Sequence, residues 1–115
     1  MSKKSEIKIN IKLDDQNVPE SIQWISTDNP EGTEAKECKG MLLSLFDKDT
    51  MDTLKIDLWT KEMQVVEMDR FFYQNLRAMA DTYFRATQNK EMAGQLQQFA
   101  NYFGEKTEVI PKATE

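Results

Sequence analysis

The sequence predicts an α+β domain, with a four-stranded antiparallel sheet arranged as a meander and followed by two helices packed on one of its faces. Two observations predict this class. Short alternating or apolar runs separated by turn residues occupy the first half of the chain, and a three-and-four spacing of apolar residues begins after Met63. Strands grouped before helices are typical of α+β domains. The 115-residue length predicts a single domain over 1–115, with 105–115 forming a partly ordered tail.

The first two strands are predicted from alternation. Residues 6–14 read EIKINIKLD, which is typical of a half-buried strand. The segment DQNVPE then supplies turn residues. Residues 21–27, SIQWIST, predict a second strand, with Trp24 and Ile25 on opposite faces. Residues 28–37 are acidic, contain proline and glycine, and are predicted to form a loop.

The third and fourth strands are predicted from the segments 38–47 and 52–63. The third, CKGMLLSLFD, is apolar on both faces. In the fourth, DTLKIDLWTKEM, Trp59 lies in the same row as Lys55 and Asp57, opposite an aliphatic row. The short connections favour antiparallel neighbours, because parallel pairing needs longer crossovers.

Two helices are predicted after Met63. The first follows the spacing of Val65, Met68, Phe72, Leu76, Met79 and Tyr83. Its N-terminal boundary is open, because neither Met63 nor Gln64 is a favoured capping residue. The second follows Met92, Leu96, Phe99 and Phe103. Asn89 is its expected N-cap and Gly104 its expected C-terminal residue.

The composition argues against several function classes. The chain has no histidine, a single cysteine and four isolated glycines, so neither a catalytic triad nor a phosphate-binding loop is indicated. The acidic run DKDTMD lacks the glycine and closing glutamate of a calcium loop and predicts a hairpin turn. We therefore expect no enzyme activity, cofactor or metal. The net charge of −5 argues against nucleic-acid binding. No signal peptide or membrane span is recognised, so a cytoplasmic protein is expected.

The outer face of the predicted sheet is the candidate functional surface. If the helices cover the face that contains Leu54 and Ile56, Trp59 points away from them. Which row of the third strand, and which of Trp24 and Ile25, joins it there is left open. The candidate partner-binding residues are Trp59, Phe46, Leu42, Trp24 and Met63. The alternative is that Trp59 is an isolated exposed aromatic residue at a strand end.

The segments LSLFDKDTMDTLKIDLWTKEMQVVEMDRFFYQNLRAMADTYFRAT and QQFANYFGEKTEVI resemble the gliding motility protein GldC of Bacteroidetes, and the opening KSEIKINIKLDDQNVPESIQW fits its N-terminal part. The most specific portion is KIDLWTKEM followed by MDRFF. The resemblance implies a small accessory protein of surface gliding, without a catalytic motif to transfer.

Three hypotheses follow. The leading one is a non-enzymatic accessory protein of gliding motility that binds protein partners of the gliding machinery, or a second copy of itself, and does not insert into membranes. The second rests on element order, which resembles that of the protein-export chaperone SecB and implies a holdase for apolar peptide segments. The third is a small-ligand-binding domain with Asp57, Trp59 or Tyr83 near its pocket.

Overall fold

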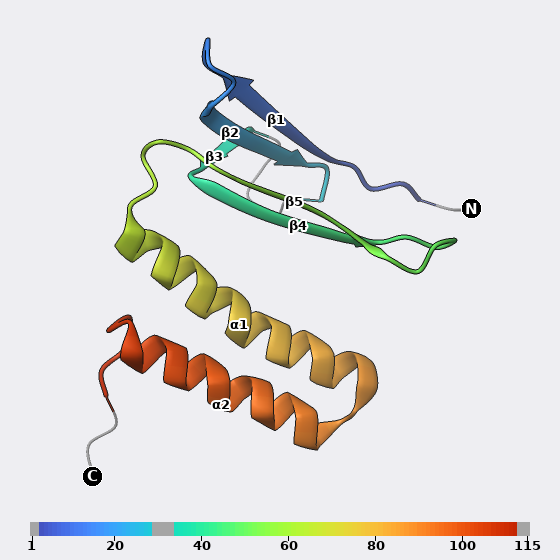
Figure 1. Ribbon diagram of the computed structural model, residues 1–115. Coiled ribbons are helices and arrows are strands. Elements are labelled where there is room, and N and C mark those ends of the chain that lie inside the picture. The colour runs from blue at the N-terminus through green and yellow to red at the C-terminus, as the bar shows by residue number, and fades with distance from the viewer. Residues whose placement is uncertain (1–2, 29–33, 113–115) are drawn as a thin grey trace. The chain divides into compact units, whose positions relative to one another are not determined.

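The computed structural model describes residues 3–28 and 34–112 (Figure 1). Within these ranges antiparallel strands precede two helices, which confirms the predicted α+β class. The chain divides into two compact units, residues 1–63 with the strands and residues 64–115 with the helices, and each is described by itself. The single domain and the packing of the helices on one sheet face stay predictions. Part of the predicted acidic loop, residues 29–33, and the end of the predicted tail lie outside the described residues.

A three-stranded antiparallel sheet contains β1 (Ile7–Leu13), β2 (Pro19–Ser26) and β3 (Lys36–Cys38), with β2 in the middle. Its register sets Trp24 opposite Ile9, and sets Ile22 opposite both Ile11 on β1 and Cys38 on β3. Cross-strand partners share a face, so the apolar rows of the three strands lie together. Ile22, at the centre of these rows, is only 1% exposed.

The prediction of one four-stranded sheet is wrong, because the segment 38–47 is divided between two sheets. The chain bends at Lys39, so β3 pairs with β2, whereas β4 (Gly40–Phe46) pairs with β5 (Thr53–Trp59) in a separate two-stranded sheet. Gly40 directly follows the bend, and a glycine inside a strand pattern commonly marks such a site. The Lys39 carbonyl accepts a hydrogen bond from the Thr60 amide at 2.8 Å, which connects the bend to the end of β5.

The predicted hairpin turn between residues 47 and 52 is confirmed. The Asp47 carboxylate accepts hydrogen bonds from the amides of Asp49 and Thr50 at 3.1 and 2.8 Å. These bonds lower the pKa of Asp47. Met51 adopts a left-handed conformation, with φ of 61°. The acidic side chain therefore serves as the acceptor that closes the turn.

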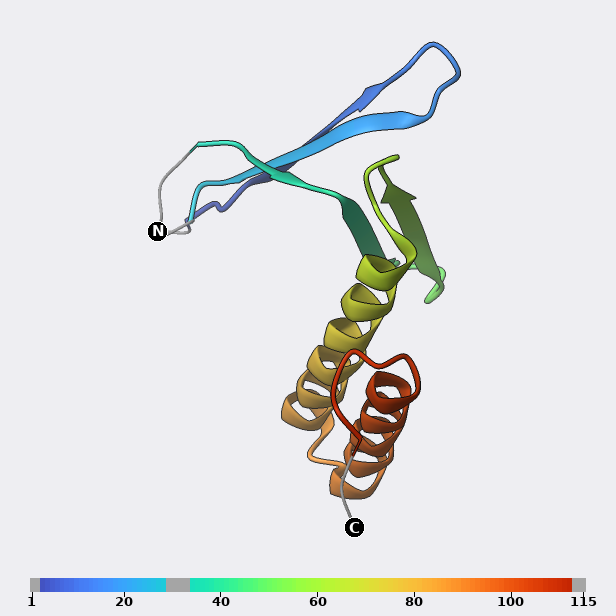
Figure 2. The same cartoon turned by 90° about the vertical axis from the view of Figure 1, so that its left-hand side faces the viewer.

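Helices α1 (Val65–Thr87) and α2 (Lys90–Lys106) form an antiparallel hairpin, in which they lie side by side (Figures 1 and 2). The N-cap of α1 is Gln64, whose amide donates to Glu67 Oε1 at 3.0 Å. Asn89 is confirmed as the N-cap of α2, because its side-chain oxygen accepts from the Met92 amide at 3.1 Å. In the part of the chain that the structure describes, neither helix combines the length and apolar character needed to cross a membrane.

Gly104 does not end α2 as predicted; the helix continues to Lys106 and is capped at Thr107. Gly104 is buried, and a Cβ atom added to it would lie 2.6 Å from Cε1 of Tyr73. Its role is to let the two helices approach closely. The residues buried within this hairpin are mostly small: Tyr73 and Ala80 on α1, and Ala93, Ala100 and Gly104 on α2.

Candidate protein-binding surface

The register of β4 and β5 assigns their side chains to two faces of the ribbon. Gly40 lies opposite Trp59, Leu42 opposite Asp57, and Leu43 opposite Ile56. Because directly opposite residues share a face, we define two surfaces. The tryptophan face contains Gly40, Leu42, Ser44, Phe46, Thr53, Lys55, Asp57 and Trp59. The leucine face contains Met41, Leu43, Leu45, Leu54, Ile56 and Leu58.

The tryptophan face has apolar side chains at both ends and an ion pair between them. Trp59 is 54% exposed and stands opposite Gly40, which offers no side chain to cover the indole. Phe46 is 67% exposed at the other end of the ribbon. Lys55 Nζ and Asp57 Oδ2 lie 3.7 Å apart along β5. The exposed indole therefore shares a row with two charged residues.

The structure places Leu42, Phe46 and Trp59 on one face and separates the other two predicted residues from them. Trp24 lines an apolar depression of about 210 Å³ together with Ile7, Ile9, Ile22, Cys38 and Met41. Met41 belongs to the leucine face, so Trp24 is grouped with the opposite surface of the ribbon. Met63 follows β5 in a turn, where its amide donates to the Thr60 carbonyl at 3.1 Å. Partner binding by these five residues stays a prediction.

A shallow depression of about 250 Å³ lies beside Trp59. Its lining combines residues from the start of β2 and the end of β5: Val18, Pro19, Asp57, Leu58 and Trp59. Such a hollow beside an exposed indole has room for one side chain of a partner. Segments that are distant in the sequence therefore form this part of the surface.

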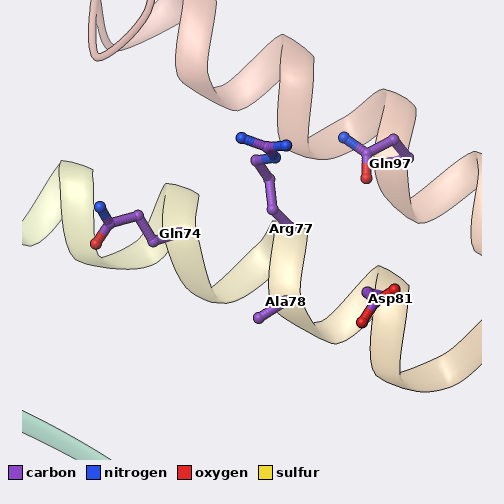
Figure 3. A pocket seen from close by; sticks show the side chains of 5 residues that line it. All are labelled: Gln74, Arg77, Ala78, Asp81 and Gln97. Atoms are coloured by element: carbon purple, nitrogen blue, oxygen red, sulfur yellow. The ribbon is translucent and has the colours of Figure 1, made fainter.

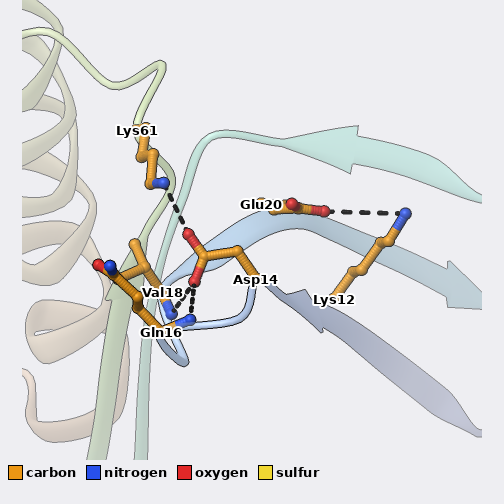
Figure 4. Close-up of polar contacts among 6 residues, drawn as sticks. All are labelled: Lys12, Asp14, Gln16, Val18, Glu20 and Lys61. Atoms are coloured by element: carbon orange, nitrogen blue, oxygen red, sulfur yellow. Dashed lines mark hydrogen bonds and ion pairs between the residues drawn. The ribbon is translucent and has the colours of Figure 1, made fainter.

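An ion pair connects the β1–β2 turn to the residues after Trp59 (Figure 4). Asp14 Oδ1 accepts from the amides of Gln16 and Val18 at 2.8 and 3.0 Å. Its Oδ2 accepts from Lys61 Nζ at 2.6 Å. Because Lys61 is two residues beyond Trp59, this pair holds the end of β5 near Val18.

The Asp14 network makes the strand unit sensitive to acid. The hydrogen bond from Lys61, followed by those from the two amides, lowers the pKa of Asp14 from 3.8 to about 2. A carboxyl group with a lowered folded-state pKa stabilises the fold at neutral pH, and this contribution disappears as the pH falls from about 4 towards 2.

We expect Asp14→Asn to lower the urea midpoint at neutral pH and to converge with the wild type near pH 2. Tryptophan fluorescence is the appropriate measurement, since both tryptophans lie in residues 1–63. Asp15→Asn is the matched control, because Asp15 is exposed in the same turn. A difference between Asp14→Asn and the wild type that stays constant down to pH 2 would contradict this assignment.

Three of the six residues of the leucine face are exposed, which periodicity alone does not indicate. Leu54 is 60% exposed, and Leu45 and Ile56 are also exposed. Packing of the helices on the face that contains Leu54 and Ile56 stays a prediction. Because β4 is apolar in both of its rows, both faces of this two-stranded ribbon present apolar side chains.

An open groove of about 430 Å³ follows the polar side of the helical hairpin (Figure 3). Gln74, Arg77, Ala78 and Asp81 of α1 and Gln97 of α2 line it. The Arg77 guanidinium lies 5.8 Å from the centre of the Tyr73 ring, and Asp81 accepts from Arg85 at 3.0 Å. The mostly polar side chains that line the groove mark the polar side of the helical hairpin.

Two features of the described residues concern reactive groups, the Cys38 thiol and the grouping of side chains that could bind a metal ion. Burial raises the pKa of the Cys38 thiol, which favours the protonated, weakly nucleophilic form. Across residues 3–28 and 34–112, no three histidine, cysteine, aspartate or glutamate side chains are grouped so that they could hold a metal ion.

Comparison with known proteins gives one finding. Residues 19–109 match the family described as gliding motility-associated protein GldC-like. The match begins at the first residue of β2 and includes every later strand and both helices. Neither a curated protein nor a solved structure matches at a significant level. Because the match extends over well more than half of the chain, this protein belongs to the GldC-like family of gliding motility-associated proteins.

Proposed function

We propose that this protein is a non-enzymatic accessory component of bacterial gliding motility that binds a protein partner through the tryptophan face. The family supports the association with gliding. The observation that supports the surface is the exposed indole of Trp59, opposite Gly40 and beside a hollow of about 250 Å³. Tryptophan is the residue type most enriched among those that dominate binding energy at interfaces.

The arrangement of charges fits a protein rather than a lipid surface. Lys55 and Asp57 form an ion pair between Trp59 and Phe46 and thus interrupt the apolar row. Interfaces of transient complexes combine such polar groups with aromatic anchors. The indole supplies binding energy, and the pair restricts which partner surfaces fit against it.

We expect Trp59→Ser to reduce colony spreading of a gliding bacterium that has this protein as its only copy. Removal of a central aromatic anchor costs about 2 kcal/mol or more of binding free energy, which is about thirtyfold in Kd. Colony spreading is measured alongside cellular abundance of the protein, so that a loss of protein is distinguished from a loss of binding.

Leu54→Ser is the matched control, because Leu54 is similarly exposed on the same strand but belongs to the leucine face. We expect it to spread like the wild type. A photo-crosslinking residue at position 59 should capture a partner that the same residue at position 54 does not. Normal spreading with Trp59→Ser at normal abundance would refute the tryptophan face as the functional surface.

A further inference from the structure

Strand β1 forms one edge of the three-stranded sheet, and its outer side has no neighbouring strand in the part of the chain that the structure describes. The Thr27 amide donates to the Glu6 carbonyl at 3.1 Å, which directs the backbone of Glu6 towards β2. Successive residues of an antiparallel strand direct their N–H and C=O groups to alternate sides. The backbone groups of Ile7, Ile9 and Ile11 are therefore directed away from β2, to the open edge.

Only a further strand can complete this edge. An unpaired edge is a template for pairing with another strand. A helix cannot supply the missing bonds, whatever its position, because its N–H and C=O groups are bonded within the helix. The strands within residues 3–28 and 34–112 already pair in the two sheets, and none of them lies beyond β1. A strand that completes the ladder therefore comes from another molecule.

The outward-directed residues also form the apolar row of β1. Ile7 is 72% and Ile11 37% exposed. Two β1 strands can pair antiparallel with Ile9 of one copy opposite Ile9 of the other. Each Ile7 then lies opposite the second copy's Ile11, and both pairs are of the hydrogen-bonded type. Cross-strand partners have Cβ atoms about 5 Å apart, so the exposed isoleucines cover each other.

The polar row of β1 selects this register. With Ile9 at the centre, Glu6 lies opposite the second copy's Lys12. In the same register Lys8 lies opposite the second copy's Asn10. Moving the centre to Lys8 or to Asn10 sets lysine opposite lysine, which is destabilising. The lysines thus exclude the neighbouring registers, and an ion pair at each end favours the one centred on Ile9.

The side chain of Lys12 is accessible to this second carboxylate. Its Nζ lies 3.7 Å from Glu20 Oε2 of the same chain (Figure 4), and the side chain is 74% exposed. An ammonium group has three donors and can contact two carboxylates. Glu6 and Lys12 of one chain lie about 20 Å apart along the strand, so they can meet only between copies.

We infer that β1 pairs with β1 of a second copy, antiparallel and centred on Ile9, which joins two three-stranded sheets into one. The Glu6–Lys12 pair forms twice, as a twofold interface requires. This edge is separate from the tryptophan face, so the inference does not depend on the proposed function. The added contacts are few and lie at an exposed edge. We therefore expect the dimer to dissociate on dilution to micromolar protein concentration, where unfolding measurements report on the monomer.

Sedimentation equilibrium of the full chain over a range of concentrations tests this inference. We expect the wild type to approach twice its 13.4-kDa mass as the concentration rises. Lys12→Glu sets glutamate opposite Glu6 at both ends and should weaken association about tenfold. Combining it with Glu6→Lys reverses both charges of each pair and should restore association. Lys8→Glu is the matched control, because it changes the same row opposite an asparagine, and it should keep the dimer mass.

Ile7→Pro tests the ladder itself, because it removes an outward-directed N–H and leaves the bonds between β1 and β2 in place. It should give a monomer. Far-UV circular dichroism verifies that each variant stays folded, and Trp59→Ser should leave the dimer mass unchanged. Three results would overturn the inference: a wild type that is monomeric at every concentration, a dimer that survives both Lys12→Glu and Ile7→Pro, or a double reversal that does not restore association. None of them would refute the tryptophan face.

Discussion

Ile22→Ala is expected to lower the free energy of unfolding of the strand unit by about 3 kcal/mol. Ile22 is the largest side chain that is fully buried among the described residues. It lies on the middle strand, opposite Ile11 and Cys38, and lines the apolar depression that also contains Trp24. Removing three carbon atoms there leaves a cavity between two neighbouring strands, and the paired backbones cannot close it.

Urea unfolding followed by tryptophan fluorescence measures this effect, since Trp24 and Trp59 both lie in residues 1–63. The matched control is Ile7→Ala, because Ile7 is on β1 and 72% exposed. It should change the free energy of unfolding by less than about 0.5 kcal/mol. Equal effects of the two substitutions would mean that Ile22 is not the centre of this core.

The contrast between Ile7 and Ile22 shows the limit of reading burial from sequence. Alternation places Ile7 in the apolar row of 6–14 and Ile22 in that of 21–27, and both rows are correct as strand faces. Periodicity reports which side chains share a face. It does not report whether a strand is central or at an edge, and this difference separates a buried isoleucine from an exposed one.

The elements with strong local signals were predicted well. Strands at Ile7–Leu13 and Thr53–Trp59, both helices and the Asn89 cap follow from spacing and capping chemistry that operate within a few residues. The division of 38–47 was missed because it depends on which strand each half pairs with, and pairing partners are distant in the sequence. Gly40 was the local signal for a bend there.

The candidate surface was predictable only in part. The sequence identified Trp59 as an unusual member of a polar row, but it left open whether Leu42 and Phe46 join that row. The hairpin turn at Asp47 fixes the register of β4 and β5. Gly40 then stands opposite Trp59, so Leu42 and Phe46 lie on the same face as Trp59. Helical spacing located the large apolar residues of both helices, but it does not by itself show where the two helices meet. Small residues at seven-residue spacing, Ala93 and Ala100, indicate instead where the helices meet.

Gly104→Ala is expected to destabilise the helical hairpin by about 2 kcal/mol. Replacing glycine with alanine inside a helix normally stabilises it by up to about 1 kcal/mol. Here the added Cβ atom would lie 2.6 and 2.7 Å from two carbons of the Tyr73 ring and 3.0 Å from Ile110 Cγ1. The Tyr73 ring is buried, so it cannot move aside without losing its own contacts, and overpacking of this kind costs more than the propensity gain.

Gly94→Ala is the matched control, because Gly94 lies on the same helix and no atom is within 4 Å of an added Cβ. It should stabilise the hairpin by about 0.5–1 kcal/mol, so the two substitutions should shift the urea midpoint in opposite directions. Far-UV circular dichroism follows this transition, with all variants at one protein concentration. If Gly104→Ala were as stabilising as Gly94→Ala, the Tyr73 ring would have to be free to move. The close approach of α1 and α2 at Gly104 would then not be a fixed property of the fold.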